Sequence, residues 1–305
     1  MQVIFGAGGP IGRQLSKELK KYTDSVRLVS RKAKKTLPEC IAFQADLAKK
    51  NDAIEAAKGC EIVYLTAGLE YKTKVWKELW PLIMSNTIEA CKLNDAALVF
   101  FDNIYMYDKN HINGMNENTP VNPSSEKGKV RALIGKMMMD EVSKGNLKGI
   151  IVRSADFISP NNSLLTEMIF NNLKKNKNAM WFMDIDKVHN FTFYKDAAAG
   201  TAILGNTKDA YGEIWHLPTD PSKLTVRQWI EMFAKELGTE PKVTVVKKSM
   251  MHMLGWFVPV IREFKEMAYQ YDRDYFFDSS KFNKKFDYKP ATPKEAVKHI
   301  VSNFK

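Results

Sequence analysis

The stretch Gly6-Ala7-Gly8-Gly9-Pro10-Ile11-Gly12 decides the fold of this chain. It follows Gln2–Phe5, an apolar run predicted to be a strand. It opens Ile11–Lys21, where isoleucine and leucine recur at every fourth position, as on one face of a helix. Glycines let the chain turn sharply and let a pyrophosphate approach the backbone, and a helix N-terminus offers free N–H groups to phosphates. This order of elements therefore predicts a dinucleotide site. The candidate contacts in the turn are Gly6, Gly8, Gly9, Pro10, Ile11 and Gly12.

Short β-rich runs alternate with helical patterns along the first half of the chain. The predicted strands are Gln2–Phe5, Val26–Ser30, Cys40–Phe43, Ile62–Thr66, Ala97–Phe101 and Gly149–Arg153. The predicted helices are Ile11–Lys21, Asn51–Lys58, Val75–Asn94 and Ser124–Lys144. Alternating β and α elements predict a doubly wound α/β fold, in which helices cover both faces of a parallel sheet.

The second half of the chain has a different pattern. The predicted strands there are Ala179–Met183, Glu213–Leu217 and Val243–Val246, and the predicted helices are Val226–Leu237 and Met250–Tyr271. Thr225 is the expected N-cap of the first of these helices and Gly238 its expected stop. Asp196, near the start of another helix, is interpreted as a helix cap or a structural anchor and not as a catalytic residue.

The composition limits the classes of function. The chain has 305 residues, which suggests two domains, and 46 Lys and Arg against 35 Asp and Glu give a net charge of +11. The basic residues occur in short clusters without a zinc-finger or RNA-binding signature, so we expect solvated lysines and no nucleic-acid partner. The longest notable apolar run, Ser249–Ile261, contains Gly255 and Pro259 and falls short of the roughly 20 residues that span a membrane.

The cysteines and histidines do not form metal or disulfide patterns. Cys40, Cys60 and Cys91 are far apart in the sequence, which predicts reduced thiols in a cytoplasmic protein. The five histidines have no spacing typical of metal ligands, so no metal site is predicted.

The spacing of Gly6, Gly9 and Gly12 as G-x-x-G-x-x-G resembles the short-chain dehydrogenase/reductase superfamily. The resemblance is to its extended and atypical members, the NAD-dependent epimerase/dehydratase-like group. It implies a Rossmann domain over residues 1–157, to which 190–217 returns. It also implies a smaller α+β domain, mainly 158–305, that covers the cofactor and selects the substrate. Members of the superfamily often pair through helices of the main domain, so a homodimer is an expected assembly.

Further segments carry the same resemblance in the family's order. Asp46-Leu47 resembles its adenine-side segment, Thr66-Ala67-Gly68 its loop beneath the cofactor, and Phe157 its nicotinamide-side segment. Asn86 lies in a stretch similar to the family's helix motif. These matches imply that Asp46, Leu47, Thr66, Ala67, Gly68 and Phe157 contact the cofactor.

The end of the second predicted strand bears on the choice between NAD and NADP. NAD-binding proteins usually place an acid there for the ribose 2′-hydroxyl, but this chain reads Ser30-Arg31-Lys32. A guanidinium attracts a 2′-phosphate and a serine hydroxyl can donate to it, so Ser30 and Arg31 favour NADP over NAD. The alternative is a solvated basic loop that also includes Lys34 and Lys35.

The catalytic set of the family is altered in this chain. The family uses a Ser or Thr after the fifth strand and a Tyr-x-x-x-Lys in the next helix. Here Asn103 takes the hydroxyl place, Lys127 the Tyr place and Arg131 the Lys place. Tyr105 is a second candidate acid, because strand alternation would put it on the same face as Asn103 and Tyr107 if the strand continues.

This departure leaves several functions open. Some isoflavone-reductase-like proteins use a Lys in a comparable role, so Lys127, Asn103 and Tyr105 are the candidate catalytic residues of an oxidoreductase acting on a small carbonyl or alcohol. Lys127 and Arg131 are also candidate cofactor contacts, and Arg131 could bind the ribose or a phosphate. The alternatives are a nucleotide-sugar epimerase or dehydratase, which the missing Tyr disfavours, and a regulator that binds NADP without catalysis. In that last case, the tyrosines are packing residues and Lys127 is a helix-start lysine.

Overall fold

The computed structural model describes residues 1–247, 249–250 and 259–304, which form two compact units. The first unit consists of Met1–Met106, Lys127–Ser154 and Ala197–Leu217. The second consists of Tyr107–Glu126, Ala155–Asp196 and Pro218–Lys305. Residues 107–126 therefore group with the second unit, whereas the sequence-based division left them in the first domain.

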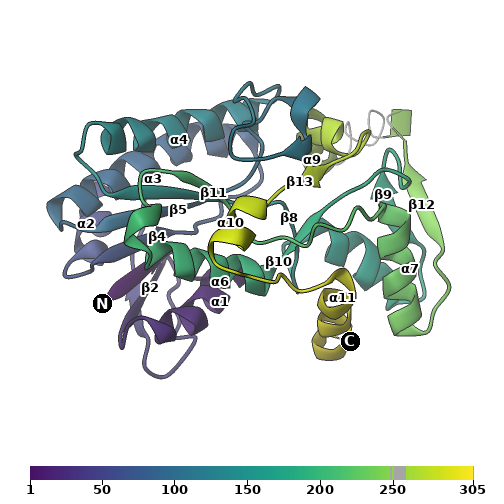
Figure 1. Cartoon of the computed structure of the whole chain (residues 1–305), viewed down its shortest axis with the longest axis horizontal. Helices are drawn as coiled ribbons and strands as arrows, with labels where there is room; N and C mark the ends of the chain where they lie inside the picture. Colours follow the sequence, from purple (N-terminus) through teal and green to yellow (C-terminus); the bar gives the residue numbers. More distant parts are fainter. Residues whose placement is uncertain (248, 251–258, 305) are drawn as a thin grey trace. The chain divides into compact units, whose positions relative to one another are not determined.

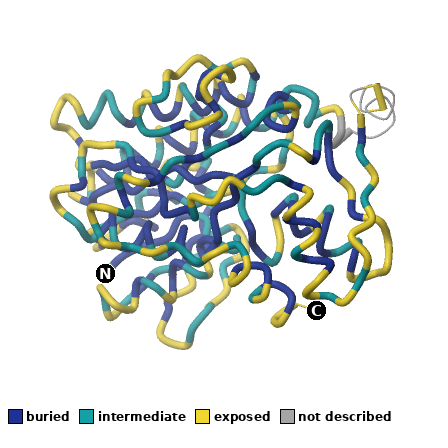
Figure 2. Tube along the Cα trace, turned by 45° about the vertical axis from the view of Figure 1, so that its right-hand side comes forward, coloured by how far each residue is buried: buried dark blue, intermediate teal, exposed yellow. Residues whose placement is uncertain are grey.

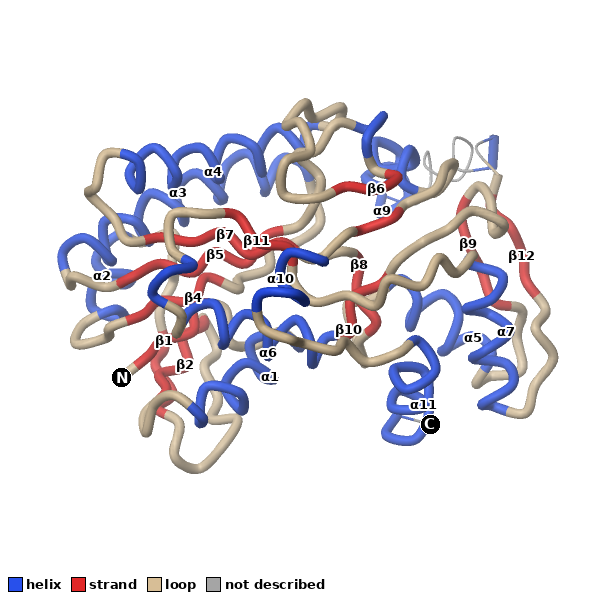
Figure 3. The backbone as a smooth tube through the Cα atoms, viewed as in Figure 1, coloured by secondary structure: helices blue, strands red, loops and turns tan. Residues whose placement is uncertain are grey.

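A seven-stranded sheet forms the centre of the first unit (Figure 3). Its strands are β1 (Gln2–Phe5), β2 (Val26–Ser30), β3 (Ile41–Gln44), β4 (Ile62–Leu65), β5 (Ala97–Asp102), β7 (Gly149–Arg153) and β11 (Ile214–His216). Their order is β11-β7-β5-β4-β1-β2-β3, and every neighbouring pair is parallel. The doubly wound α/β prediction is confirmed. The order reverses between β1 and β4, and ligands of such sheets bind beyond the carboxyl ends of the strands at this point.

Helices cover both faces of this sheet (Figure 1). They are α1 (Pro10–Glu18), α2 (Lys50–Ala57), α3 (Thr73–Leu93), α4 (Glu126–Ser143) and α6 (Tyr194–Gly205). Helices α2, α3 and α4 lie on one face, and α1 and α6 on the other. The four helices predicted for the first half are present, with ends that differ by one or two residues, apart from the 3-10 turn η1 (Leu19–Lys21) that finishes the first.

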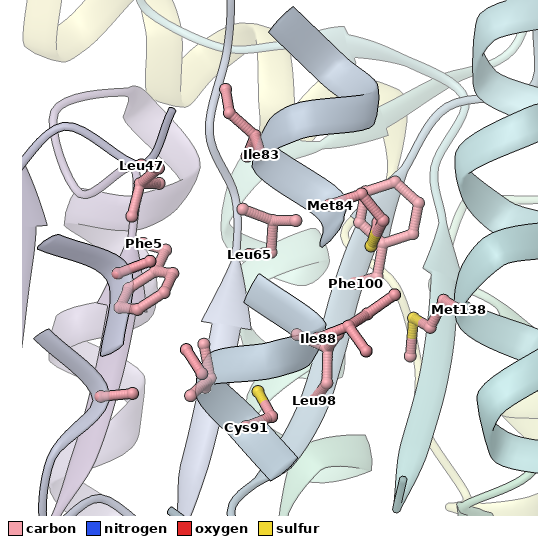
Figure 4. Close-up of a cluster of buried hydrophobic side chains, with 14 of the residues drawn as sticks. Phe5, Leu47, Leu65, Ile83, Met84, Ile88, Cys91, Leu98, Phe100 and Met138 are labelled. Carbon is pink, nitrogen blue, oxygen red and sulfur yellow. The ribbon is translucent and has the colours of Figure 1, made fainter. Parts of the chain in front are cut away.

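The apolar core of the first unit fixes where the strands end. Phe5, Leu65 and Phe100, from three adjacent strands, pack with Met84 of α3 and Met138 of α4 in one buried cluster (Figure 4). Full burial of a side chain of this size contributes about 1.5–3 kcal/mol. Figure 2 shows burial along the backbone, and every residue of β1 and β7 is buried. The loops that follow β1, β4 and β5 are thereby held at one edge of the sheet.

Among its described residues, the second unit contains three short parallel strand pairs. These pairs are β8 (Asp156–Ile158) with β10 (Phe191–Phe193), β9 (Ala179–Phe182) with β12 (Val243–Val246), and β6 (Asn113–Met115) with β13 (Phe276–Phe277). Its larger helices are α7 (Val226–Leu237) and α11 (Pro293–Phe304), and shorter ones are η2 (Lys109–His111), η3 (Leu165–Phe170), α5 (Asn171–Leu173), α9 (Pro259–Phe264), η5 (Lys265–Gln270) and α10 (Ser280–Lys285). This mixture of strands and helices is the predicted α+β organisation.

Two local predictions for the second unit are confirmed. Thr225 caps α7 in a capping box with Gln228, and Gly238 ends the helix in the left-handed region at φ +69°. The carboxylate of Asp196 accepts hydrogen bonds from the Tyr288 hydroxyl and the Ala291 amide, both at 2.8 Å, so it anchors the C-terminal segment. The helix predicted over Met250–Tyr271 lies partly outside the described residues, and its described end divides into α9 and η5.

Across the part of the chain that the structure describes, no helix is both long enough and apolar enough to cross a lipid bilayer.

Candidate cofactor site and its neighbouring cations

The glycines of the turn between β1 and α1 fall into two groups, those that packing requires and those that border open space. Gly6 has φ +98°, and a Cβ there would lie 2.3 Å from the Cα of Ala67. A Cβ on Gly12 would lie 2.8 Å from the Cα of Ala7. These two positions therefore require glycine for the fold itself. Gly8 and Gly9 have no atom within 4 Å of an added Cβ, so they border open space.

The open side of the turn has the chemistry of an anion site. Gly9 is the N-cap of α1 with extended backbone, no side chain caps the helix, and Pro10 occupies its first turn. The first amides of α1 therefore have no side-chain acceptor, and the helix dipole favours negative charge at this point. These features fit the pyrophosphate of a dinucleotide, which approaches glycine backbone at the N-terminus of a helix.

Hydrogen bonds tie the turn to its neighbouring strands. The amides of Gly6 and Ala7 both donate to the Val29 carbonyl, at 2.9 and 3.2 Å. The Thr66 amide donates to the Phe5 carbonyl at 2.8 Å, and its hydroxyl lies 3.4 Å from the Phe5 and Gly6 carbonyl oxygens. The structure thus brings Thr66 and Ala67 against the glycine turn, as the sequence predicted for one site, and Gly68, the next residue, also borders open space.

The segment after β3 is fixed by a helix side chain. The Asn86 amide of α3 donates to the Leu47 carbonyl at 3.0 Å, and the Asp46 carboxylate accepts from the Ala48 amide at 3.1 Å. The Ala45 amide donates to the Ser30 carbonyl, so Asp46 and Leu47 follow directly beside the end of β2. At that end, Ser30 is half-buried and Arg31 is exposed.

The region after β5 differs from the expectation for Tyr105. The strand ends at Asp102, and the Asn103 side-chain oxygen accepts from the Tyr105 amide at 3.1 Å. The strand does not continue through Tyr105, so the condition under which Asn103, Tyr105 and Tyr107 would share a strand face is not met. The ring of Tyr105 instead stacks on Trp76 of α3, at 6.1 Å between centroids and 15° between planes.

Lys127 lies at the start of α4 and is fully buried. Its ammonium donates to the Thr73 hydroxyl at 2.9 Å and lies 4.6 Å from the centre of the Tyr71 ring. Trp76 packs edge-on against Tyr71, at 5.7 Å between ring centres. Trp76 therefore contacts both Tyr105 and the ring that holds Lys127, which joins two of the candidate catalytic residues in one cluster.

Arg131, four residues further along α4, is buried and binds a carboxylate of the same unit. Its Nε donates to Asp102 Oδ1 at 2.6 Å, and its guanidinium lies 4.6 Å from the Trp80 ring and 4.9 Å from the Phe100 ring. Arg153 at the end of β7 also meets Asp102, with Nε 3.4 Å from Oδ2. All three charged side chains are at most 5% exposed.

The sequence did not predict this buried Arg–Asp–Arg cluster of Arg131, Asp102 and Arg153. The only signal for it was that Asp102 ends an otherwise apolar strand, where an acid needs a partner. Arg131 was a candidate contact for a cofactor ribose or phosphate. In the structure its guanidinium is hydrogen-bonded to Asp102 of the same unit. Two cations around one carboxylate form an arrangement in which removal of the acid leaves uncompensated buried charge.

The remaining predictions concern Phe157, a metal site and the three cysteines. Phe157 lies on β8 in the second unit, whereas the other candidate residues lie in the first. Within the described residues, no group of three or more His, Cys, Asp or Glu side chains could hold a metal ion. The three cysteines are buried, and none forms a disulfide.

The sequence of the chain matches the model of one known protein family. The model of the NAD dependent epimerase/dehydratase family matches residues 2–217. None of the curated proteins matches the sequence.

Solved structures share the fold at low sequence identity. UDP-glucose 4-epimerase of Thermus thermophilus, in complex with NAD, has a TM-score of 0.79 at 16% identity, covering 100% of this chain and 99% of that one. DesIV of Streptomyces venezuelae, a dTDP-glucose 4,6-dehydratase with NAD and TYD bound, has a TM-score of 0.78 at 15% identity, covering 99% and 97%. WbmH of Bordetella bronchiseptica, in complex with NAD+, has a TM-score of 0.74 at 18% identity, covering 99% and 97%.

Proposed function

The chain belongs to the NAD dependent epimerase/dehydratase family, and we propose that it is an NADP(H)-dependent oxidoreductase within it. In this proposal it transfers a hydride to or from a small carbonyl or alcohol. The observation that carries the proposal is the β1–α1 turn, where Gly8 and Gly9 border open space at the uncapped end of α1. Bound nicotinamide supplies the hydride, and the residues of the chain hold the cofactor, orient the substrate and donate to its oxygen.

The preference for NADP is supported by the end of β2. No acid directly follows the end of that strand, and the exposed guanidinium of Arg31 is suited to a 2′-phosphate, because it offers paired N–H groups. The similar proteins crystallised with NAD make NAD the alternative cofactor. Affinities of the purified chain for NADPH and NADH decide between the two.

Two donors in the first unit are suited to a carbonyl oxygen. Because Asn103 Oδ1 accepts from the Tyr105 amide, the Asn103 side-chain nitrogen is left to donate to a substrate. Lys127 takes the place of the family's Tyr, and the Thr73 hydroxyl and Tyr71 ring fix its ammonium. In the proposed reaction Lys127 donates the proton that the substrate oxygen gains when the carbonyl is reduced.

A turnover experiment tests the reductase. NADPH consumption is measured with a panel of small aldehydes and ketones, for the wild type, Lys127→Met and the control Lys129→Met, which removes an exposed lysine from the same helix. We expect turnover by the wild type and the control, and a loss of about 10²–10⁴-fold in Lys127→Met with NADPH binding retained. Equal turnover by all three proteins would contradict the role of Lys127.

A regulator that binds NADP without chemistry is the second candidate. The observation in its favour is Arg131, which takes the place of the family's Lys. Its guanidinium binds Asp102. For this function we expect tight NADPH binding, no consumption with any carbonyl, and a partner interaction that changes when NADPH is added. Conversion of UDP-glucose or dTDP-glucose would instead favour the epimerase or dehydratase alternative.

A further inference from the structure

Aromatic rings pack around His189 inside the second unit. The rings of Tyr271 and Tyr275 lie parallel to the imidazole, at 5.5 and 4.3 Å between centroids, and Trp181 meets it edge-on at 5.7 Å. All four residues of this ring cluster are buried. His189 Nε2 lies 3.0 Å from Asp156 Oδ2, so an acid already engages the one basic side chain of the cluster. The ring cluster is therefore suited to an uncharged molecule.

Gln270, the last residue of η5, is a buried amide next to this cluster. It directly precedes Tyr271, and neither its Oε1 nor its Nε2 has a hydrogen-bond partner among the described residues. Trp181 Nε1 also lacks an acceptor within that part of the chain, whereas Trp229 Nε1 donates to the His189 carbonyl at 3.1 Å. Buried polar groups are nearly always paired, because leaving them unpaired is unfavourable. The packing of the unit alone does not account for these unpaired atoms.

The local geometry turns Gln270 inward and connects it to Trp181. Side chains three positions apart eclipse in a 3-10 helix, so Gln270 shares a face of η5 with Met267, which is also buried. The next residue, Tyr271, meets the Trp181 ring edge-on at 5.6 Å. The amide and the indole N–H thus belong to one largely aromatic region with few polar groups, which is the composition of small-molecule sites.

The side chain of Gln270 presents a hydrogen-bond donor next to an acceptor. Two hydroxyl groups on neighbouring carbons match this pair, because one donates to Oε1 while the other accepts from Nε2. The indole N–H of Trp181 adds a donor for a further oxygen, and the rings supply apolar surface for the carbon atoms. This recognition involves no charge on the ligand.

We propose that Gln270 and Trp181 bind vicinal hydroxyl groups of the substrate, so that the chain acts on small uncharged aldehydes or ketones that carry such a pair. The inference rests on the proposed function and names its substrate class. Both amide atoms are enclosed in this structure, so the ligand enters when η5 moves; hydrogen bonds of a 3-10 segment have poorer geometry than those of an α-helix. Binding then supplies the partners that the folded chain does not.

The kinetic test compares glyceraldehyde with propanal, which has the same carbon chain without the hydroxyls. NADPH consumption is measured for the wild type, Gln270→Met and the control Gln44→Met, which makes the same change at an exposed glutamine. We expect the wild type to prefer glyceraldehyde at least about 100-fold in kcat/KM, because a site built for hydroxyls rejects an analogue without them. Gln270→Met should lower kcat/KM for glyceraldehyde about 10- to 100-fold and leave propanal within about threefold, and Gln44→Met should change neither by more than about twofold.

A stability measurement separates recognition from a structural role. Methionine has nearly the volume of glutamine and no amide, so ligand-free Gln270→Met should melt about 2–6 °C above the wild type. A lower melting temperature would mean that the amide is paired in the folded protein and would overturn the inference. Trp181→Phe keeps a ring and removes the donor, so it should weaken glyceraldehyde about 3- to 10-fold more than propanal. This variant carries the test if Gln270→Met does not fold.

A binding measurement without turnover distinguishes the inference from the proposed function. Tryptophan fluorescence is titrated with 1,2-propanediol and with 1-propanol, which lacks the second hydroxyl, in the wild type and in Gln270→Met. We expect a saturable change only for the diol and only in the wild type. That result together with no consumption of any carbonyl would contradict the reductase but support the diol site. Equal responses to the two alcohols, or equal kcat/KM for the two aldehydes in the wild type, would overturn the site.

Discussion

The glycine turn after β1 and the inner face of α4 contribute to the same unit, but they are built in opposite ways. The turn is open, because Gly8 and Gly9 have no side chains and lie at a helix end that no side chain caps. The α4 face is filled, because Lys127 and Arg131 are buried and each is engaged by neighbouring groups. The comparison teaches that the glycine turn leaves room for a ligand, whereas the positions predicted to match the family's Tyr and Lys carry buried cations that groups of the same unit bind.

Gly6→Ala should have the largest effect on the turn. A Cβ at this position would lie 2.3 Å from a backbone atom of Ala67, in a backbone conformation with φ +98°. Because neither backbone segment can yield cheaply, we expect a loss of at least about 3 kcal/mol in the free energy of unfolding. Denaturant unfolding measures it. Wild-type stability in this variant would mean that the strand-to-loop approach is looser than the structure has it.

Asp102→Asn is the corresponding change on the filled side. The substitution keeps the shape of the side chain but removes the buried negative charge that Arg131 and Arg153 both contact. We expect a loss of about 3–5 kcal/mol. Asp186→Asn, which breaks the exposed pair with Arg227, is the matched control and should lose no more than about 1 kcal/mol. Similar losses in both variants would show that burial of the Asp102 cluster has no special consequence.

Thr73→Val tests how Lys127 is held. The variant removes the hydroxyl that accepts from the Lys127 ammonium while keeping nearly the same volume. We expect a loss of about 1–3 kcal/mol, because a buried donor is left short of an acceptor. Thr87→Val, which removes a hydroxyl bonded only to its own helix carbonyl of Ile83, should cost less. The reverse order of the two losses would argue that the Thr73 contact is incidental.

The smallest expected effect is a pH dependence at the sheet beneath the turn. The buried phenol of Tyr64 donates to Gln2 and accepts from Asn206, and burial raises its pKa well above the ordinary value of 10.0. The folded state thus favours the neutral phenol, so its contribution is complete below pH 10 and is lost as the pH rises beyond it. Unfolding at about pH 8 and about pH 10.5 should show a decline that is smaller in Tyr64→Phe. An equal decline in both proteins would assign it to other groups.

The sequence predicted the sheet well because its signals are local. Strands such as Gln2–Phe5 and Gly149–Arg153 are short apolar runs between turn residues, and the glycine spacing identifies the turn that follows the first of them. The strands β8 and β13 have only three and two residues, too few for periodicity to distinguish them from loop.

The rebuilt part of the site was not predictable in the same way. The pairing of Asp102 with Arg131 joins side chains 29 positions apart, and no pattern along the chain specifies it. Tyr105 was expected to share a face with Asn103 only if the strand continued, but β5 ends at Asp102 and the Asn103 turn follows it.

The measurement that tests the central claim most directly is NADPH binding and thermal stability of Gly8→Ala beside the wild type. An added methyl group at Gly8 meets no atom within 4 Å in the structure, so the fold has room for it, but it would project into the space assigned to the cofactor. The account predicts a melting temperature within about 2 °C of the wild type and a loss of NADPH affinity of at least about tenfold. Unchanged affinity with unchanged stability would contradict the claim that this turn holds the dinucleotide.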